Sequence, residues 1–217
     1  MIEAVIFDMD GLLINSEPFW QEAEVEIFKM AGISLTKAMC QQTMGLRIDE
    51  AINYWDKKQG LKNFTKKQVQ EMIMDKVVEY VLQNGEPLDG VINCLEFFEE
   101  KNIPMAIASS SHYKIIQSVV KKLNITSYFD LIVSAQDTEY GKPHPGIFIE
   151  TAKRLQISPE NILVFEDSPN GVLAALSARM KVIAVPDKEL KNKKEFLAAD
   201  LVIDSLDSWN EKLWSKL

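Results

Sequence analysis

The hydrophobic positions along the chain follow two different spacings, which divide it into an interrupted core and an inserted block. A fully apolar run at residues 4–7 predicts a strand buried on both faces of a parallel sheet. Residues 17–82 contain no convincing strand and carry apolar stripes at helical spacing, with breaks at Gly32 and at 60–63. This block predicts a small bundle of helices.

From Leu88 onward, apolar runs of strand length alternate with helical stripes, which is the pattern of βαβ units. We expect strands at 103–109, 131–134, 161–166, 181–185 and 200–203, and helices at 89–101, 115–123, 145–156, from Pro169 and at 205–214. The chain is therefore predicted to be an α/β protein whose parallel-sheet core is formed by residues 1–15 and 85–217. Residues 16–84 would form a helical domain, joined to the core by links near 13–17 and 83–88.

Composition narrows the range of partners. Of the 217 residues, 47% are hydrophobic and 26% are charged, as in ordinary soluble globular proteins. The net charge of −8 argues against nucleic acid and against an anionic membrane surface, because both need a basic footprint. Cys40 and Cys94 form neither a zinc-ligand spacing nor a disulfide framework, the first apolar run is too short for a signal peptide, and no apolar stretch could span a bilayer. We expect a cytoplasmic protein and a monomer.

The first strand ends in two carboxylates, Asp8 and Asp10, which are followed by Gly11. In open α/β sheets ligands bind beyond the carboxyl ends of the strands, so these side chains would project into a binding crevice. An ordinary acidic turn would use the same residue types. Three later stretches of the chain favour the interpretation of Asp8 and Asp10 as part of a binding crevice.

Two other core strands also end in polar residues. The first leads into Ser109-Ser110-Ser111, whose hydroxyl and N–H groups could hold phosphate oxygens, although a serine there could equally be a helix cap only. The second leads into Glu166 and Asp167, which repel each other unless a cation lies beside them. Oxygen ligands without a His/Cys cluster favour Mg²⁺ over zinc.

Two basic residues could complete a site for an anion. Lys142 precedes Pro143, which would stiffen the backbone around a fixed positive charge, although a Lys-Pro pair is also common in surface turns. Arg47 follows Gly45 at the start of a helix, where it could reach an anion or remain solvated.

Together these motifs, Asp8-Met9-Asp10-Gly11, Ser109, Lys142-Pro143 and Glu166-Asp167, occur in one order on successive elements, and this set resembles the haloacid dehalogenase superfamily of phosphotransferases. The resemblance covers the whole chain, and the helical insert is similar to the cap of the β-phosphoglucomutase and sugar-phosphatase branch. The stretches SEP at 16–18, GLRID at 45–49, GKPHP at 141–145 and EDSPNG at 166–171 are similar to bacterial hexitol and 2-deoxyglucose-6-phosphate phosphatases. Leu12 departs from the Thr or Val that is more common in the family, and this puts nothing catalytic in doubt.

The resemblance implies a Rossmann-like core, an all-helical cap and a phosphatase for small sugar or polyol phosphates. Asp8 would attack phosphorus and become an aspartyl phosphate, and Asp10 would protonate the leaving alkoxide and then accept a proton from water. Lys142 would balance the charge, while the Ser109 hydroxyl and the Ser110 N–H would hold the phosphate.

The same resemblance implies Mg²⁺ as the cofactor. The Asp8 carboxylate, the Asp10 carbonyl and Asp167 would hold it, with Glu166 either as a further ligand or as a group behind the ligands. Closure of the cap would bring Arg47 onto the sugar. A small phosphorylated molecule is thus the expected partner.

Three other functions use parts of this pattern. A sugar phosphomutase of the β-phosphoglucomutase type is the main alternative, but such enzymes carry a His after the first motif, at the start of the cap. The corresponding stretch here reads Asn15-Ser16-Glu17-Pro18-Phe19-Trp20, and the only two histidines, His112 and His144, lie far downstream. A dehalogenase needs no acid for the leaving group, so Asp10 counts against it. A non-catalytic binding module would not need all four charged motifs.

Overall fold

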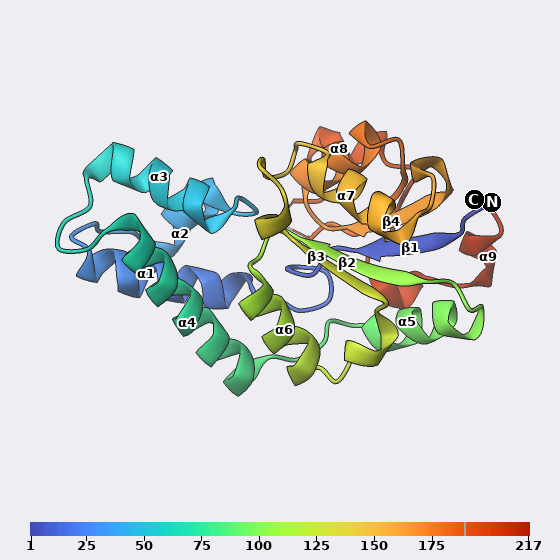
Figure 1. Ribbon diagram of the computed structural model, residues 1–217, viewed down its shortest axis with the longest axis horizontal. Coiled ribbons are helices and arrows are strands. Elements are labelled where there is room, and N and C mark those ends of the chain that lie inside the picture. Colours follow the sequence, from blue (N-terminus) through green and yellow to red (C-terminus); the bar gives the residue numbers. More distant parts are fainter. Residues whose placement is uncertain (189) are drawn as a thin grey trace.

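The computed structural model describes residues 1–188 and 190–217 and shows a sheet covered by helices, with a helical extension at one end (Figure 1). Its strands are β1 (Ala4–Phe7), β2 (Met105–Ser109), β3 (Leu131–Ser134), β4 (Ile162–Glu166), β5 (Lys181–Ala184) and β6 (Leu201–Val202). They form a parallel sheet in the order β3-β2-β1-β4-β5-β6. The predicted α/β class with a parallel sheet is confirmed.

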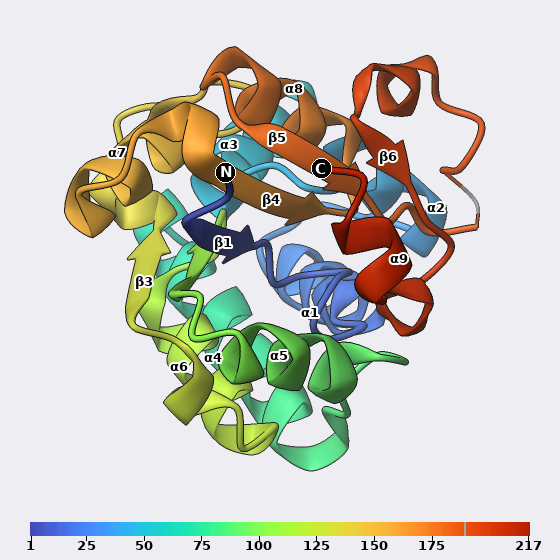
Figure 2. The same cartoon turned by 90° about the vertical axis from the view of Figure 1, so that its right-hand side faces the viewer.

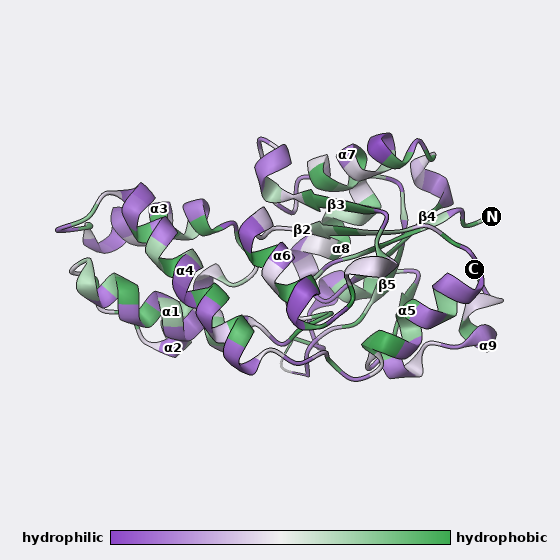
Figure 3. Ribbon diagram, turned by 60° about the horizontal axis from the view of Figure 1, so that its bottom comes forward, coloured by the Kyte–Doolittle hydropathy of each residue, from purple (hydrophilic) through white to green (hydrophobic). Residues whose placement is uncertain are grey.

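The sheet is buried on both faces because successive side chains of β1 point to opposite sides. Val5 and Phe7 join one hydrophobic cluster with α5 (Val91–Glu100) and α6 (Tyr113–Lys122), whereas Ala4 and Ile6 join a second cluster with α7 (Gly146–Leu155) and α8 (Pro169–Ser177). Figure 2 shows the helices on the two sides of the sheet, and Figure 3 shows the hydrophobic colouring of the strands between them.

The register of the two central strands brings the later motifs together. Phe7 of β1 is paired with Phe165 of β4, and their rings stack with centroids 5.1 Å apart. The next residues on the two strands are Asp8 and Glu166, so the first and fourth motifs lie at the same edge of the sheet.

The inserted block consists of α1 (Glu17–Met30), α2 (Lys37–Cys40), α3 (Ile48–Gln59) and α4 (Lys66–Asn84). The two links to the core lie side by side, since Ile14 forms an antiparallel bridge with Pro87 and the Leu88 N–H donates to the Leu13 carbonyl at 3.1 Å. Helix α4 packs against α6, which brings the bundle close to the core (Figure 1). In the described part of the chain, no helix has the length and apolar character needed to cross a bilayer.

The end of the chain differs from the sequence prediction. The predicted helix at 205–214 is wrong as a continuous element: a single 3₁₀ turn at Leu206–Ser208 is followed by extended backbone and by α9 (Glu211–Trp214). The break is at Asn210, whose extended backbone places its side chain to accept from the N–H groups of Lys212 and Leu213, so it caps a new helix instead of continuing the old one. The short helix α2 was not predicted, because four residues are too few for a periodic pattern.

Candidate active site

The site is built around Asp8, which follows β1 directly and is 6% exposed. Its N–H donates to the Phe165 carbonyl at 3.0 Å, so the residue continues the pairing of the sheet. The chain then turns at Gly11, where φ is +80° and where an added Cβ would lie 2.2 Å from Asp167 Oδ2. Glycine is required at this position both for the turn and for the close approach of the fourth motif.

Lys142 is the buried cation of the site. Its ammonium donates to Asp8 Oδ1 at 2.7 Å, to the Ala108 carbonyl at 3.2 Å and to Glu166 Oε1, which uses all three of its protons. Burial alone would lower the pKa of Lys142, but the charges of Asp8 and Glu166 outweigh it and raise the pKa. Lys142 therefore remains charged and ties the third motif to the first and the fourth.

Glu166 acts as the anchor for this lysine. It is fully buried, and its second oxygen, Oε2, accepts from the N–H and the hydroxyl of Ser168, both at 3.0 Å. An added Cβ at Gly171 would lie 1.8 Å from Glu166 Oε1, so the first turn of α8 can approach the carboxylate only through glycine. Ser168 caps this helix, since its hydroxyl accepts from the Gly171 N–H at 3.0 Å.

The neighbouring carboxylates carry more negative charge than Lys142 neutralises. Asp8, Glu166 and Asp167 each offer an oxygen within 4.8 Å of the others. Burial raises the pKa of Asp8 in spite of Lys142, and burial together with the charges of Glu166 and Asp8 raises the pKa of Asp167 well above its usual range. Among the described residues, the buried Oδ1 of Asp167 has no hydrogen-bond partner. An unpartnered carboxylate oxygen beside excess negative charge fits a hard divalent cation such as Mg²⁺.

Asp10 is held by hydrogen bonds on both of its oxygens. Oδ1 accepts from the Ser16 hydroxyl at 2.5 Å and from Trp20 Nε1 at 3.2 Å, and both donors belong to the start of the helical block. Oδ2 accepts from the Ser111 hydroxyl at 2.7 Å and from the Ser109 hydroxyl at 3.3 Å, which belong to the core.

Three of these donors were not predicted as site residues. Ser16 and Trp20 lie one helical turn apart, at the cap and in the first turn of α1, and therefore face the same side. In the sequence, Trp20 indicates only that a His is absent, and Ser111 is only part of a serine run. The spacing of Ser16 and Trp20 would have shown a shared face, but not that this face meets Asp10.

The serine loop after β2 is itself fixed. The hydroxyl of Ser109 accepts from the Ser111 N–H at 3.1 Å, and the Ser134 hydroxyl donates to the Ser111 carbonyl at 2.7 Å. Ser109 is fully buried and Ser110 is half-buried. The loop thus places Ser109 against Asp10, while Ser110 lies between two fixed residues.

Arg47 lies where the helical block meets the core. Its guanidinium donates to the carbonyls of Thr138 and Glu139, both at 3.0 Å, and pairs with Asp49 at 3.1 Å. It also lies against Gly141, where an added Cβ would be 2.9 Å from the Arg47 Cδ. In this conformation the guanidinium holds the loop that precedes Lys142.

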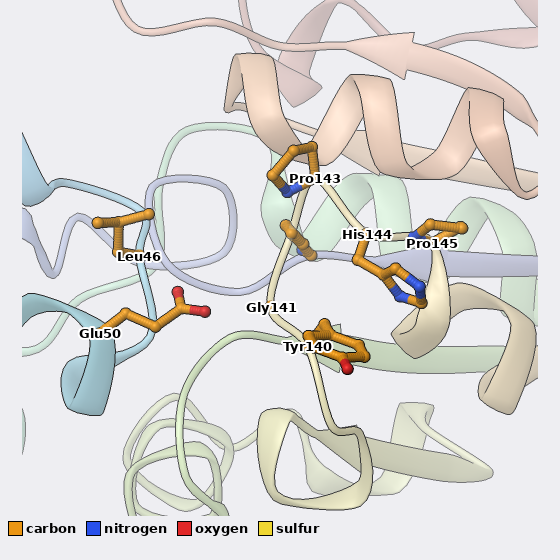
Figure 4. Close-up of a pocket in the computed structure, with 8 residues that line it drawn as sticks. Leu46, Glu50, Tyr140, Gly141, Pro143, His144 and Pro145 are labelled. Carbon is orange, nitrogen blue, oxygen red and sulfur yellow. The ribbon is translucent and has the colours of Figure 1, made fainter.

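An open cavity of about 680 Å³ lies against that loop (Figure 4). Tyr140, Gly141, Pro143, His144 and Pro145 line it from the core, and Leu46 and Glu50 line it from the helical block. Lys142 also lines this cavity, and its ammonium pairs with Asp8 at 2.7 Å.

Comparisons with known proteins show the family of this chain. Residues 5–185 match the family model described as haloacid dehalogenase-like hydrolase. The chain is 32% identical over 212 residues to hexitol phosphatase B of Escherichia coli K12, covering 97% of this chain and 96% of the relative. It is 34% identical over 205 residues to a phosphorylated carbohydrates phosphatase of Thermotoga maritima, covering 93% of each chain.

Solved structures give the same result for the fold. A β-phosphoglucomutase from Clostridium difficile superposes with a TM-score of 0.86 at 27% identity, covering 100% of this chain and 96% of that one. CbbY from Rhodobacter sphaeroides in complex with phosphate superposes with a TM-score of 0.88 at 22% identity, covering 96% of each chain.

Proposed function

Because the chain belongs to the family of haloacid dehalogenase-like hydrolases, we propose that it is a Mg²⁺-dependent phosphatase of small sugar or polyol phosphates that acts through an aspartyl phosphate. The observation that carries the proposal is the buried Asp8 carboxylate, which is held by Lys142 at 2.7 Å and lies close enough to Asp10 for the charge of that carboxylate to raise the pKa of Asp8. Homology supports the substrate class, since two relatives that match nearly the whole chain are named for hexitols and phosphorylated carbohydrates.

In the first half-reaction, Asp8 attacks phosphorus while the bond from phosphorus to the substrate oxygen breaks. Asp10 gives its proton to the leaving alkoxide and becomes a carboxylate. The Lys142 ammonium offsets the repulsion between the anionic nucleophile and the anionic phosphate, and the Ser109 hydroxyl and the Ser110 N–H hold phosphate oxygens.

In the second half-reaction, water attacks the phosphorus of the aspartyl phosphate and passes its proton to Asp10. The bond between phosphorus and Asp8 breaks, which releases inorganic phosphate and restores both side chains. Mg²⁺ would be held by the carboxylates of Asp8 and Asp167 and by the Asp10 carbonyl, and when bound it would supply positive charge against the phosphate. Both oxygens of Glu166 already accept hydrogen bonds, from Lys142 and from Ser168, which supports the view that Glu166 does not bind the metal directly.

We place the substrate-selecting cap at residues 16–84 and the catalytic core at 1–15 and 85–217. The paired links support these boundaries, because the chain leaves and re-enters the core at adjacent points. The contact of Arg47 with the loop before Lys142 supports a role for this residue in the closed form, next to the substrate.

The test is a screen of sugar, polyol and nucleoside monophosphates with Mg²⁺, in which phosphate release gives kcat/KM for each compound. A hexose or hexitol phosphate should be the best substrate. Faster hydrolysis of a nucleoside monophosphate than of every sugar or polyol phosphate would contradict the substrate class, and no hydrolysis of any compound would contradict the phosphatase.

A sugar phosphomutase is a second candidate, supported by the superposition on a β-phosphoglucomutase. The enzyme should be incubated with β-glucose 1-phosphate and a trace of glucose 1,6-bisphosphate, and glucose 6-phosphate and free phosphate followed separately. We expect phosphate release to be faster than isomerisation, because Asp10 is free to accept a proton from water once the leaving group has departed. The reverse order would establish the mutase.

A further inference from the structure

The two oxygens of Asp10 have different environments. Oδ1 faces the helical block and accepts from Ser16 and Trp20, whereas Oδ2 faces the serine loop of the core and accepts from Ser109 and Ser111. The proposed phosphate position is beside that same serine loop. Oδ2 is therefore the oxygen on the side of the proposed phosphate.

The donors differ in chemistry as well as in position. A serine hydroxyl can donate or accept, so the hydrogen bonds of Ser109 and Ser111 can reverse when Oδ2 gains a proton. The indole N–H of Trp20 can only donate. Whether Asp10 is a carboxylate or a neutral acid, Oδ1 must therefore remain the acceptor of the hydrogen bond from Trp20.

Resting on the proposed function, we infer that Trp20 is a positioning residue that dedicates Oδ2 of Asp10 to proton transfer. In the neutral acid the indole N–H occupies Oδ1, so the proton lies on Oδ2 and passes to the leaving alkoxide as the bond to phosphorus breaks. In the second half-reaction the same Oδ2 accepts the proton of the attacking water. Trp20 itself exchanges no proton in either step.

Substrates with different leaving groups distinguish positioning of Asp10 from a general structural role of Trp20, because a structural defect would lower activity on all of them. An alkoxide needs a proton to leave, whereas p-nitrophenolate leaves readily without one, so only the alkyl substrate depends on correct placement of Asp10. kcat/KM reports the steps up to departure of the leaving group and is not affected by slow hydrolysis of the phosphoenzyme. The measurement is therefore kcat/KM of Trp20→Phe with p-nitrophenyl phosphate and with the best hexose or hexitol phosphate of the screen.

We expect Trp20→Phe to lower kcat/KM for the sugar phosphate about tenfold or more, as part of the typical 10²–10⁴-fold effect of general acid catalysis, and to change that for p-nitrophenyl phosphate less than about threefold. Trp55→Phe is the matched control, because Trp55 lies in the same helical block and its indole donates to Thr43 Oγ1 at 3.3 Å, away from Asp10. Trp55→Phe should not lower kcat/KM for the sugar phosphate more than kcat/KM for p-nitrophenyl phosphate.

A second variant separates the lost hydrogen bond from the lost ring volume. Replacement of the Trp20 indole by the isosteric benzothiophene removes the N–H but keeps the shape of the ring, and it should show the same selective loss as Trp20→Phe. Equal losses on both substrates, or no loss on either with the benzothiophene, would overturn the inference while leaving the phosphatase established. A wild-type enzyme that hydrolyses neither substrate would instead overturn the proposed function, and the inference with it.

Discussion

Replacement of Lys142 by methionine is expected to destabilise the fold as well as to stop catalysis. Methionine has a similar length but no donor, so the three hydrogen bonds of the ammonium to Asp8, Glu166 and the Ala108 carbonyl are lost together. The two carboxylates are 6% and 0% exposed and would face each other without a cation between them.

The magnitude follows from this burial. Removing one partner of a buried ion pair typically costs about 3–5 kcal/mol, because the remaining charge stays desolvated and unpaired. This is a large fraction of the roughly 5–15 kcal/mol by which a domain is stable. Urea-induced unfolding of wild type and Lys142→Met at pH 7.5, with EDTA to remove divalent cations, measures the difference. Turnover with Mg²⁺ should fall at least ~10²-fold.

The double variant Lys142→Met/Glu166→Gln is the matched control. It removes one of the two unpaired charges, so it should be more stable than Lys142→Met alone. The deficit should also shrink at low pH. Burial already raises the folded-state pKa of Asp8 to about 7 against the effect of Lys142, and loss of the lysine should raise it further, so this stability is present at acidic pH and is lost as the pH rises through the folded pKa of Asp8. A Lys142→Met protein within about 1 kcal/mol of wild type at pH 7.5 would refute this account of the site.

Three further outcomes are expected. Asp8→Asn keeps the shape of the side chain but removes the nucleophile, so Mg²⁺-dependent turnover should fall to background, and substantial turnover would contradict the mechanism. Glu24 is 7% exposed, and burial raises its pKa to about 7, against the hydrogen bond from Cys40 and together with the charge of Glu17. A carboxyl whose folded pKa is raised stabilises the protein at acidic pH, and this stability is lost as the pH rises through about 7. Glu24→Gln should therefore be about 1–3 kcal/mol more stable than wild type in urea unfolding at pH 8.5 and show little gain at pH 5. An equal difference at both pH values would argue against titration of Glu24. Arg47→Ala should raise KM for the sugar phosphate about tenfold with little change in kcat, and an equal fall of kcat for sugar phosphate and p-nitrophenyl phosphate would indicate a loss of structure instead.

The sequence by itself determined the class of fold and most of the groups that meet at the site. Apolar runs of strand length ending in Asp8, Ser109 and Glu166 predicted strands whose carboxyl ends share one edge, and the structure confirms these strands. The reason is local: a strand buried on both faces must be continuously apolar, so a polar residue marks its end. The same reasoning failed at 205–214, because a capping side chain and an extended backbone at Asn210 outweigh the helical spacing.

Only the tertiary structure decided how these groups are used. The register of β1 and β4 places Glu166 next to Asp8, where both accept from Lys142, and the glycines at 11 and 171 leave room for Asp167 and Glu166 to approach. The contact of Trp20 with Asp10 depends on the angle at which α1 leaves the core, which no periodic pattern records. Hydrophobic spacing reports which face of an element is buried, whereas the partner of a polar side chain depends on distances between elements that are far apart in the chain.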